Sequence, residues 1–265
     1  MRYFKIKYLI GSLFILSALY GCKKVINVKL DNAGIQTVIT GEVNNDPGPY
    51  KVNISKSVNY SSDNIFPPVS GAFVTITGNG LIDTLSETSP GIYETHNLLG
   101  IPGNSYSLYI SINDTVYTAT SIMPQPVPLD SISFIAGRDN NIYAVANFQD
   151  PPGVPNFYQF IEYANGVRFS NGRGNSVFDD RLSDGRYINR LLYDDSTDIK
   201  LGITLEVQMK CIDQAVYTYW NELLEISGGG GFSSPTPANP MSNISGGALG
   251  YFSANTTTSR SVLIQ

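Results

Sequence analysis

The sequence predicts a mainly β fold, in which an N-terminal β-sandwich is followed by a second β-rich domain that carries one α-helix. Three observations predict it: short segments of alternating apolar and polar residues, frequent turn residues between them, and a single stretch with helical spacing. Alternation with a period of two places one face of a strand in the core and the other in water. We therefore expect a sandwich domain over residues 36–123 and a second domain over residues 129–265.

Three segments of the first half show this alternation most clearly. Their apolar positions are Tyr50, Val52 and Ile54; Ala72, Val74 and Ile76; and Tyr106, Leu108, Ile110 and Ile112. Clusters of Asn, Gly, Pro and Asp, such as residues 45–49 and 102–104, separate the segments and supply the backbone angles that turns need. Strands at this spacing are typical of an antiparallel sandwich.

Alternating prolines at residues 124–128 predict an extended connector between the two halves. Beyond it, residues 142–148, 157–163 and 203–209 are the clearest strands, and Asn165-Gly166 predicts a hairpin turn. The tail predicts a pair of strands over residues 248–254 and 261–264.

Residues 213–226 have helical spacing, with Asp213 as the N-cap and glycines 228–231 at the end. The apolar stripe of this helix comprises Val216, Tyr219, Trp220, Leu223 and Leu224. Such a stripe favours a helix that packs on a sheet rather than a ligand site.

The N-terminus has the features of a secretory signal peptide over residues 1–21. Basic residues precede an uncharged run from Tyr8 to Gly21, and Cys22 follows directly. This run is shorter than the roughly 20 apolar residues that a membrane-spanning helix needs. Leu19, Gly21 and Cys22 resemble a bacterial lipobox, which implies that Cys22 is acylated, although an ordinary cleavage site is the alternative. Residues 22–35 then form a lipidated tether, and the lipid attaches the protein to a membrane.

Composition narrows the possible partners. The net charge is −5 and becomes more negative once the basic residues of the signal peptide are removed, which argues against nucleic acid as a partner. If Cys22 carries lipid, Cys211 is left without a cysteine partner, and its apolar surroundings predict a buried, inert thiol.

Catalytic motifs are missing from the sequence. His96 is the single histidine, and no nucleophile elbow, zinc-protease motif or phosphate-binding glycine loop is present. We therefore expect a protein that is not an enzyme and has no cofactor. We expect His96 to be an exposed or hydrogen-bonded loop residue.

An acidic region at residues 179–198 is the one remaining candidate for chemistry. Its aspartates are Asp179, Asp180, Asp184, Asp194, Asp195 and Asp198. Calcium prefers such oxygen ligands, but Leu182 and Leu191 stand where an EF-hand loop would place ligands. Surface ion pairs with the neighbouring arginines are the simpler interpretation, so no metal site is predicted.

Three segments carry a resemblance to a known family: residues 37–41 with 49–52, residues 89–93 with 102–106, and the tail at residues 239–252. With them, the chain resembles the Bacteroidota lipoproteins of domain-of-unknown-function family 4249. The resemblance implies a TonB-dependent outer-membrane receptor as a partner and carries over no catalytic residue. The first domain is also similar to Ig-like, transthyretin-like and carboxypeptidase-regulatory-like sandwiches, through residues 69–72 and 91–93.

Four sites resemble the O-glycosylation motif of exported Bacteroidota proteins, in which Asp precedes the modified hydroxyl. They are Thr84, Thr115, Ser131 and Ser196.

These observations predict a lipid-anchored envelope protein of the outer membrane that binds as an accessory to a TonB-dependent receptor. They leave open whether it faces the surface or the periplasm. The alternative is a carbohydrate- or peptide-binding lipoprotein that acts alone. A metal-dependent or acid-pair hydrolase is the third hypothesis.

Overall fold

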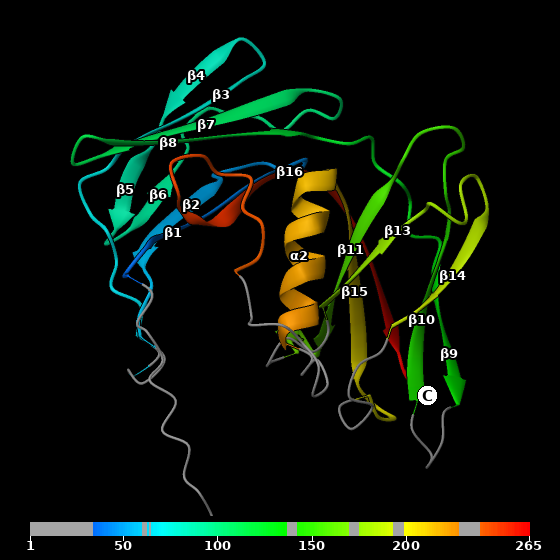
Figure 1. The fold of residues 1–265 in the computed structure, drawn as a ribbon. Helices are drawn as coiled ribbons and strands as arrows, with labels where there is room; N and C mark the ends of the chain where they lie inside the picture. The colour runs from blue at the N-terminus through cyan, green and yellow to red at the C-terminus, as the bar shows by residue number, and fades with distance from the viewer. Residues whose placement is uncertain are drawn as a thin grey trace, which may run out of the picture. The chain divides into compact units, whose positions relative to one another are not determined.

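A computed structural model describes residues 34–59, 63, 65–136, 142–169, 175–192, 199–227 and 239–265. Within these residues, sixteen strands form three sheets, and there is one helix (Figure 1). The chain is therefore mainly β, as the sequence predicts. The lipidation candidate Cys22, the proposed signal peptide and most of the tether lie outside the described residues.

A nine-stranded sheet runs through both halves of the chain and organises the fold. Its order is β12-β11-β15-β16-β1-β2-β6-β5, with β13 also paired to β11. The strands are β1 (Thr37–Asn44), β2 (Lys51–Lys56), β5 (Ser86–Ser89), β6 (Ile92–Glu94), β11 (Phe157–Ala164), β12 (Val167–Arg168), β13 (Asn175–Asp179), β15 (Thr204–Ile212) and β16 (Leu249–Leu263).

Two smaller sheets complete the fold. One has the order β4-β3-β7-β8 and the other the order β14-β10-β9. Their strands are β3 (Phe73–Gly78), β4 (Leu81–Thr84), β7 (Ser105–Ile112), β8 (Thr115–Ile122), β9 (Ser131–Ala136), β10 (Ile142–Gln149) and β14 (Tyr187–Leu191).

Each small sheet packs against the large sheet, and a hydrophobic core lies between them. The first core joins β3, β7 and β8 to β1, β2 and part of β16, and its largest side chains include Tyr93, Tyr106 and Phe252. The second joins β10 and β14 to β11 and β15 and contains Phe148, Tyr158 and Phe160. Met123 belongs to the first core and Val127 to the second, so the proline-rich connector passes from one core to the other.

The alternating segments of the first half form strands with the predicted inward faces. Val52, Ile54, Leu108 and Ile110 are all buried in the first core. The hairpin between β11 and β12 turns at Asn165-Gly166, and both residues have positive φ, as this turn requires.

The C-terminal strand differs from the prediction of two strands over residues 248–254 and 261–264. These residues form one continuous strand, β16, whose first half pairs in parallel with β1 and whose second half pairs antiparallel with β15. Its first half contributes Phe252 and Ala254 to the first core. The prediction of two strands was wrong because the polar residues 255–261, which suggest a turn, lie within the sheet and find partners there.

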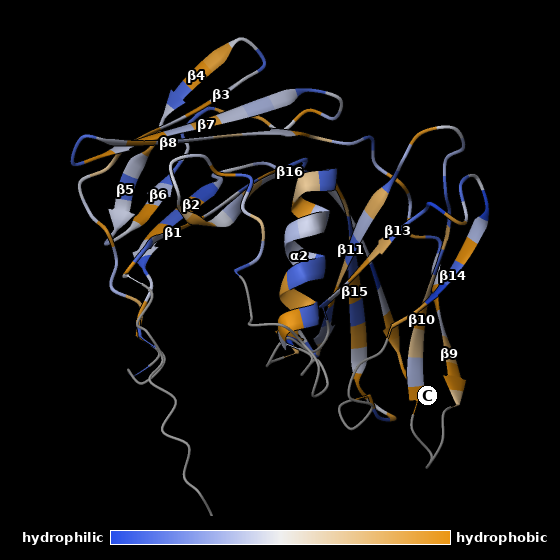
Figure 2. Ribbon diagram, in the orientation of Figure 1, coloured by the Kyte–Doolittle hydropathy of each residue, from blue (hydrophilic) through white to orange (hydrophobic). Residues whose placement is uncertain are grey.

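The helix α2 (Gln214–Ser227) contacts β11, β13 and β16 of the nine-stranded sheet. Its Asp213 N-cap is confirmed, because the carboxylate accepts the N–H of Val216 at 2.9 Å. Figure 2 shows hydrophobic and hydrophilic residues interspersed along the helix, and Val216 is fully buried. No helix in the described part of the chain is long and apolar enough to span a membrane.

Candidate functional site

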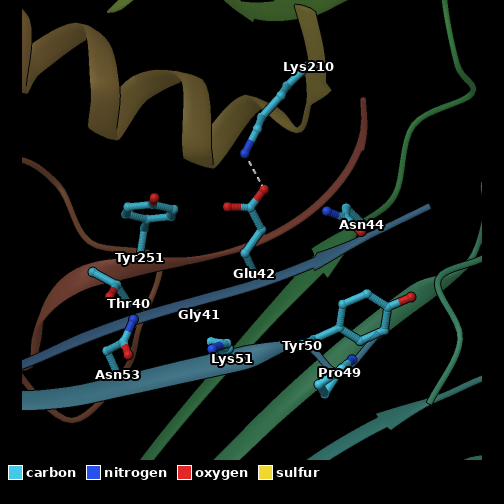
Figure 3. A pocket seen from close by; sticks show the side chains of 10 residues that line it. All are labelled: Thr40, Gly41, Glu42, Asn44, Pro49, Tyr50, Lys51, Asn53, Lys210 and Tyr251. Carbon is cyan, nitrogen blue, oxygen red and sulfur yellow. Dashed lines mark hydrogen bonds and ion pairs between the residues drawn. The ribbon is translucent and has the colours of Figure 1, made fainter. Parts of the chain in front are cut away.

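A polar cleft of about 350 Å³ lies on the nine-stranded sheet beside α2 (Figure 3). Alternate residues of β1 and β2 face it, because side chains two apart on a strand share a face. Four strands supply its side chains: Thr40, Glu42, Asn44, Lys51, Asn53, Lys210 and Tyr251. The intervening residues Ile39, Val43, Val52 and Ile54 point into the first core on the other face of the sheet.

An ion pair between Glu42 and Lys210 crosses the cleft and joins β1 to β15 (Figure 3). The side chain of Lys210 is 13% exposed and that of Glu42 is 33% exposed. Glu42 also accepts a hydrogen bond of 2.9 Å from the side-chain amide of Asn255, a fully buried residue of β16. The pair is therefore held in place, while part of the Glu42 carboxylate still faces solvent.

One aromatic residue of the cleft, Tyr251, contacts α2. The ring of Tyr251 packs against Tyr219 and Trp220, with ring centroids 5.0 and 5.4 Å away. Burial is the main cause that raises the pKa of the Tyr251 hydroxyl above its usual value, and the nearby Glu42 carboxylate acts in the same direction. Tyr251 thus stays protonated and can donate a hydrogen bond.

The lining residues of the cleft determine what it can hold. It presents the hydroxyl of Thr40, the amides of Asn44 and Asn53, and ionic groups of both signs. It is small for a ligand site and more polar than most such sites. These groups fit a polar ligand or a short polar segment of a protein partner.

Comparison with known protein families assigns the chain. The model of a domain of unknown function, DUF4249, matches residues 23–261. The chain belongs to the DUF4249 family. No curated protein matches the chain. The match includes strands of both cores and every residue that lines the cleft.

The tail of this DUF4249 chain, which is among the segments behind the predicted resemblance, has a structural role. The side chain of Asn243 pairs with the backbone of Phe252, and the hydroxyl of Ser242 donates to the carbonyl of Gly250 at 2.7 Å. Residues 249–255 pair with β1 on one edge, and these side chains bind the backbone groups that point away from β1. The tail sequence therefore completes the sheet beside the first core.

The predicted glycosylation sites are accessible where the structure describes them. Thr84, Thr115 and Ser131 are exposed on β4, β8 and β9, and Ser196 lies outside the described residues. Their modification stays a prediction.

Only two aspartates of the acidic region, Asp180 and Asp184, form a cluster in the described residues. Asp180 and Asp184 approach Asp150, with carboxylate oxygens within 4.8 Å of one another, and sequence reasoning missed Asp150 because it lies 30 residues away. Each carboxylate accepts a backbone N–H: Gly185 donates to Asp150, Asn156 to Asp180 and Gly153 to Asp184, at 2.8–2.9 Å. These bonds join the loops at residues 150–156 and 180–185.

The other predicted aspartates do not join this group among the described residues. Asp179 instead pairs with Arg181 and accepts a hydrogen bond from Tyr217 of α2. Asp194, Asp195 and Asp198 lie outside the described residues.

Cys211 is a free, buried thiol in the second core. Burial raises its pKa above the ordinary value, so the reactive thiolate is disfavoured. The predicted inert role of this cysteine agrees with its position.

Proposed function

We propose that this DUF4249 protein is a lipid-anchored binding protein of the cell envelope that acts as an accessory to a TonB-dependent outer-membrane receptor. The polar cleft is the observation that carries the binding role. It lies on a sheet that two cores hold rigid, and rigid elements position binding groups precisely.

The proposed anchor rests on the sequence alone. Cys22 directly follows an uncharged run and Gly21. Acyl chains contribute about 0.8 kcal/mol per buried methylene, and two or more of them hold a protein stably on a membrane. The Cys22→Ser variant should therefore leave the membrane fraction. Retention of this variant in membranes after a carbonate wash would contradict the anchor.

Affinity purification from the native membrane tests the partner. The full-length protein should retain a TonB-dependent receptor in a stoichiometric complex, identified by mass spectrometry. Asn53→Arg, which places a bulky cation in the cleft, should abolish this retention. Thr120→Arg is the matched control, because Thr120 is exposed on the outer face of the four-stranded sheet. A receptor retained equally by both variants would place the contact elsewhere, and absence of any receptor would refute the partner.

The composition of the cleft favours one second candidate, a carbohydrate- or peptide-binding lipoprotein that acts alone. Amide and hydroxyl groups beside a carboxylate are suited to hydrogen-bond sugar hydroxyls or peptide groups. Glycan and peptide arrays with the wild type and with Asn53→Arg separate this candidate from the first. Ligand binding that needs no receptor and is lost in Asn53→Arg would support it.

A further inference from the structure

The single histidine of the chain lies between a serine and an aspartate. The Nε2 atom of His96 lies 3.0 Å from the hydroxyl of Ser86, and its Nδ1 atom lies 3.3 Å from Oδ1 of Asp83. A nucleophile, a base and an acid at hydrogen-bond distance in this order are the geometric signature of a catalytic triad. The sequence did not predict this group, because no recognised catalytic motif surrounds any of the three residues.

Asp83 is fixed more firmly than a surface aspartate. It is 5% exposed, and its Oδ2 atom accepts the backbone N–H groups of His96, Asn97 and Leu98 at 2.7–3.0 Å. Burial would raise the pKa of this carboxyl, but the N–H groups of Asn97, His96 and Leu98 outweigh burial and lower the pKa below its ordinary value. Asp83 is therefore ionised at neutral pH and acts only as an acceptor.

The charge of Asp83 fixes the tautomer of His96. Because Oδ1 of Asp83 can only accept, Nδ1 of a neutral His96 carries the ring proton. The lone pair of Nε2 then faces the Ser86 hydroxyl and can take its proton. The three backbone bonds explain why Asp83 is buried, but they do not require a serine on the far side of the imidazole.

The surroundings of Ser86 leave it open to a substrate. Ser86 is exposed at the start of β5, the last strand of the nine-stranded sheet, and the His96 side chain is 49% exposed. Ser86 pairs with Glu94, which in turn pairs with Lys51 of the polar cleft. At about 4.8 Å per strand, the Ser86 backbone lies about 10 Å from that of Lys51.

We propose that Ser86, His96 and Asp83 form a hydrolytic centre for carboxylic esters. Ser86 Oγ bonds to the acyl carbon while its proton passes to His96 Nε2. The bond from the acyl carbon to the alcohol oxygen breaks, and His96 returns the proton to that oxygen. Water then gives a proton to His96 Nε2 while its oxygen bonds to the acyl carbon. The bond from that carbon to Ser86 Oγ breaks, His96 returns the proton to Ser86 Oγ, and the acid is released.

This proposal is independent of the binding role proposed for the cleft. The binding role is tested by retention of a receptor or glycan in Asn53→Arg, whereas the hydrolytic centre is tested by covalent labelling at Ser86. The two proposals can therefore fail separately.

A fluorophosphonate probe tests the nucleophile on the full-length protein in detergent. Ser86 Oγ should form a bond to phosphorus and release fluoride, and peptide mapping should place the adduct on Ser86. Labelling should fall about 100-fold or more in Ser86→Ala and in His96→Gln, as expected for loss of a nucleophile or a general base. Ser89→Ala is the matched control and should label like the wild type, because Ser89 is exposed on the same strand and the single histidine bonds to Ser86 instead.

Hydrolysis of p-nitrophenyl acetate adds a kinetic readout. The wild type should hydrolyse this ester faster than the uncatalysed reaction does, and His96→Gln should lose this excess rate. Asp83→Asn should also lower the rate, because an amide cannot hold the same tautomer; if it unfolds, His96→Gln still decides the matter, because His96 is exposed. Absence of labelling at Ser86, or labelling that survives in His96→Gln, would overturn the proposal.

Discussion

Asn243 forms two hydrogen bonds with the backbone of Phe252, nine residues further along the chain. Its side-chain nitrogen donates to the Phe252 carbonyl at 2.7 Å, and its side-chain oxygen accepts the Phe252 N–H at 2.9 Å. One amide side chain thus replaces a neighbouring strand at this point of β16. At Ala254, two residues after Phe252, the hydroxyl of Ser121 has the same role and accepts the backbone N–H.

Replacing Asn243 with Ala should lower the free energy of unfolding by about 1–3 kcal/mol, because two backbone groups lose their partners. Denaturant unfolding followed by circular dichroism measures this difference. Met241→Ala is the control, since its side chain is exposed in the same segment, and it should change stability little. Equal stability of the two variants would contradict this role of Asn243.

Gly250→Ala should destabilise the protein by at least about 3 kcal/mol or prevent folding. A Cβ atom at this position would lie 1.9 Å from the carbonyl oxygen of Ile39, and the backbone has φ of +97°. Gly247→Ala separates the effect of the clash from the effect of positive φ. Gly247 also has positive φ, but a Cβ atom there would meet open space. That variant should lose only about 1–2 kcal/mol. Thermal unfolding of both variants measures the comparison.

The ion pair between Glu42 and Lys210 should couple β1 energetically to β15. A double-mutant cycle with Glu42→Gln and Lys210→Met should give a coupling energy of about 1 kcal/mol, reduced by the partial exposure of Glu42. The same cycle on Lys51 and Glu94 is the control. Lys51 is 59% exposed, so that coupling should be below about 0.5 kcal/mol. A larger coupling in the exposed pair would contradict the expectation.

Stability should fall at alkaline pH through Tyr217. Burial and the hydrogen bond to Asp179 raise the pKa of its hydroxyl to about 12. Because this pKa is above the unfolded value of 10.0, the contribution is complete below pH 10 and is lost as pH rises to about 12. The slope of unfolding free energy against pH in this range should be shallower in Tyr217→Phe. Thr120→Ala, on the exposed face of the four-stranded sheet, removes no titrating group and should keep the slope of the wild type.

Glycosylation should appear in the intact mass of the protein purified from its native cells. Thr84, Thr115 and Ser131 are exposed, so a modifying enzyme can reach them. We expect a mass above that of peptide plus lipid, and Thr115→Val should remove one increment from it. A mass equal to peptide plus lipid would contradict all of these sites.

Sequence by itself determined the class of fold and the local elements. Val52, Ile54, Leu108 and Ile110 alternate with polar neighbours, and this local pattern is sufficient to give each strand its inward face. The Asp213 cap and the Asn165-Gly166 turn are equally local, since each depends on the backbone within a few residues.

Only the tertiary structure decided which distant segments meet. The parallel pairing of β1 with β16 joins the two ends of the described chain, and it places Glu42 beside Asn255 and Lys210. The approach of Ser86, His96 and Asp83 likewise depends on where β4 ends and β5 joins the edge of another sheet. Alternation specifies which face of a strand is buried but not which strand lies next to it. The register and partners of strands far apart in sequence arise only when the two cores pack.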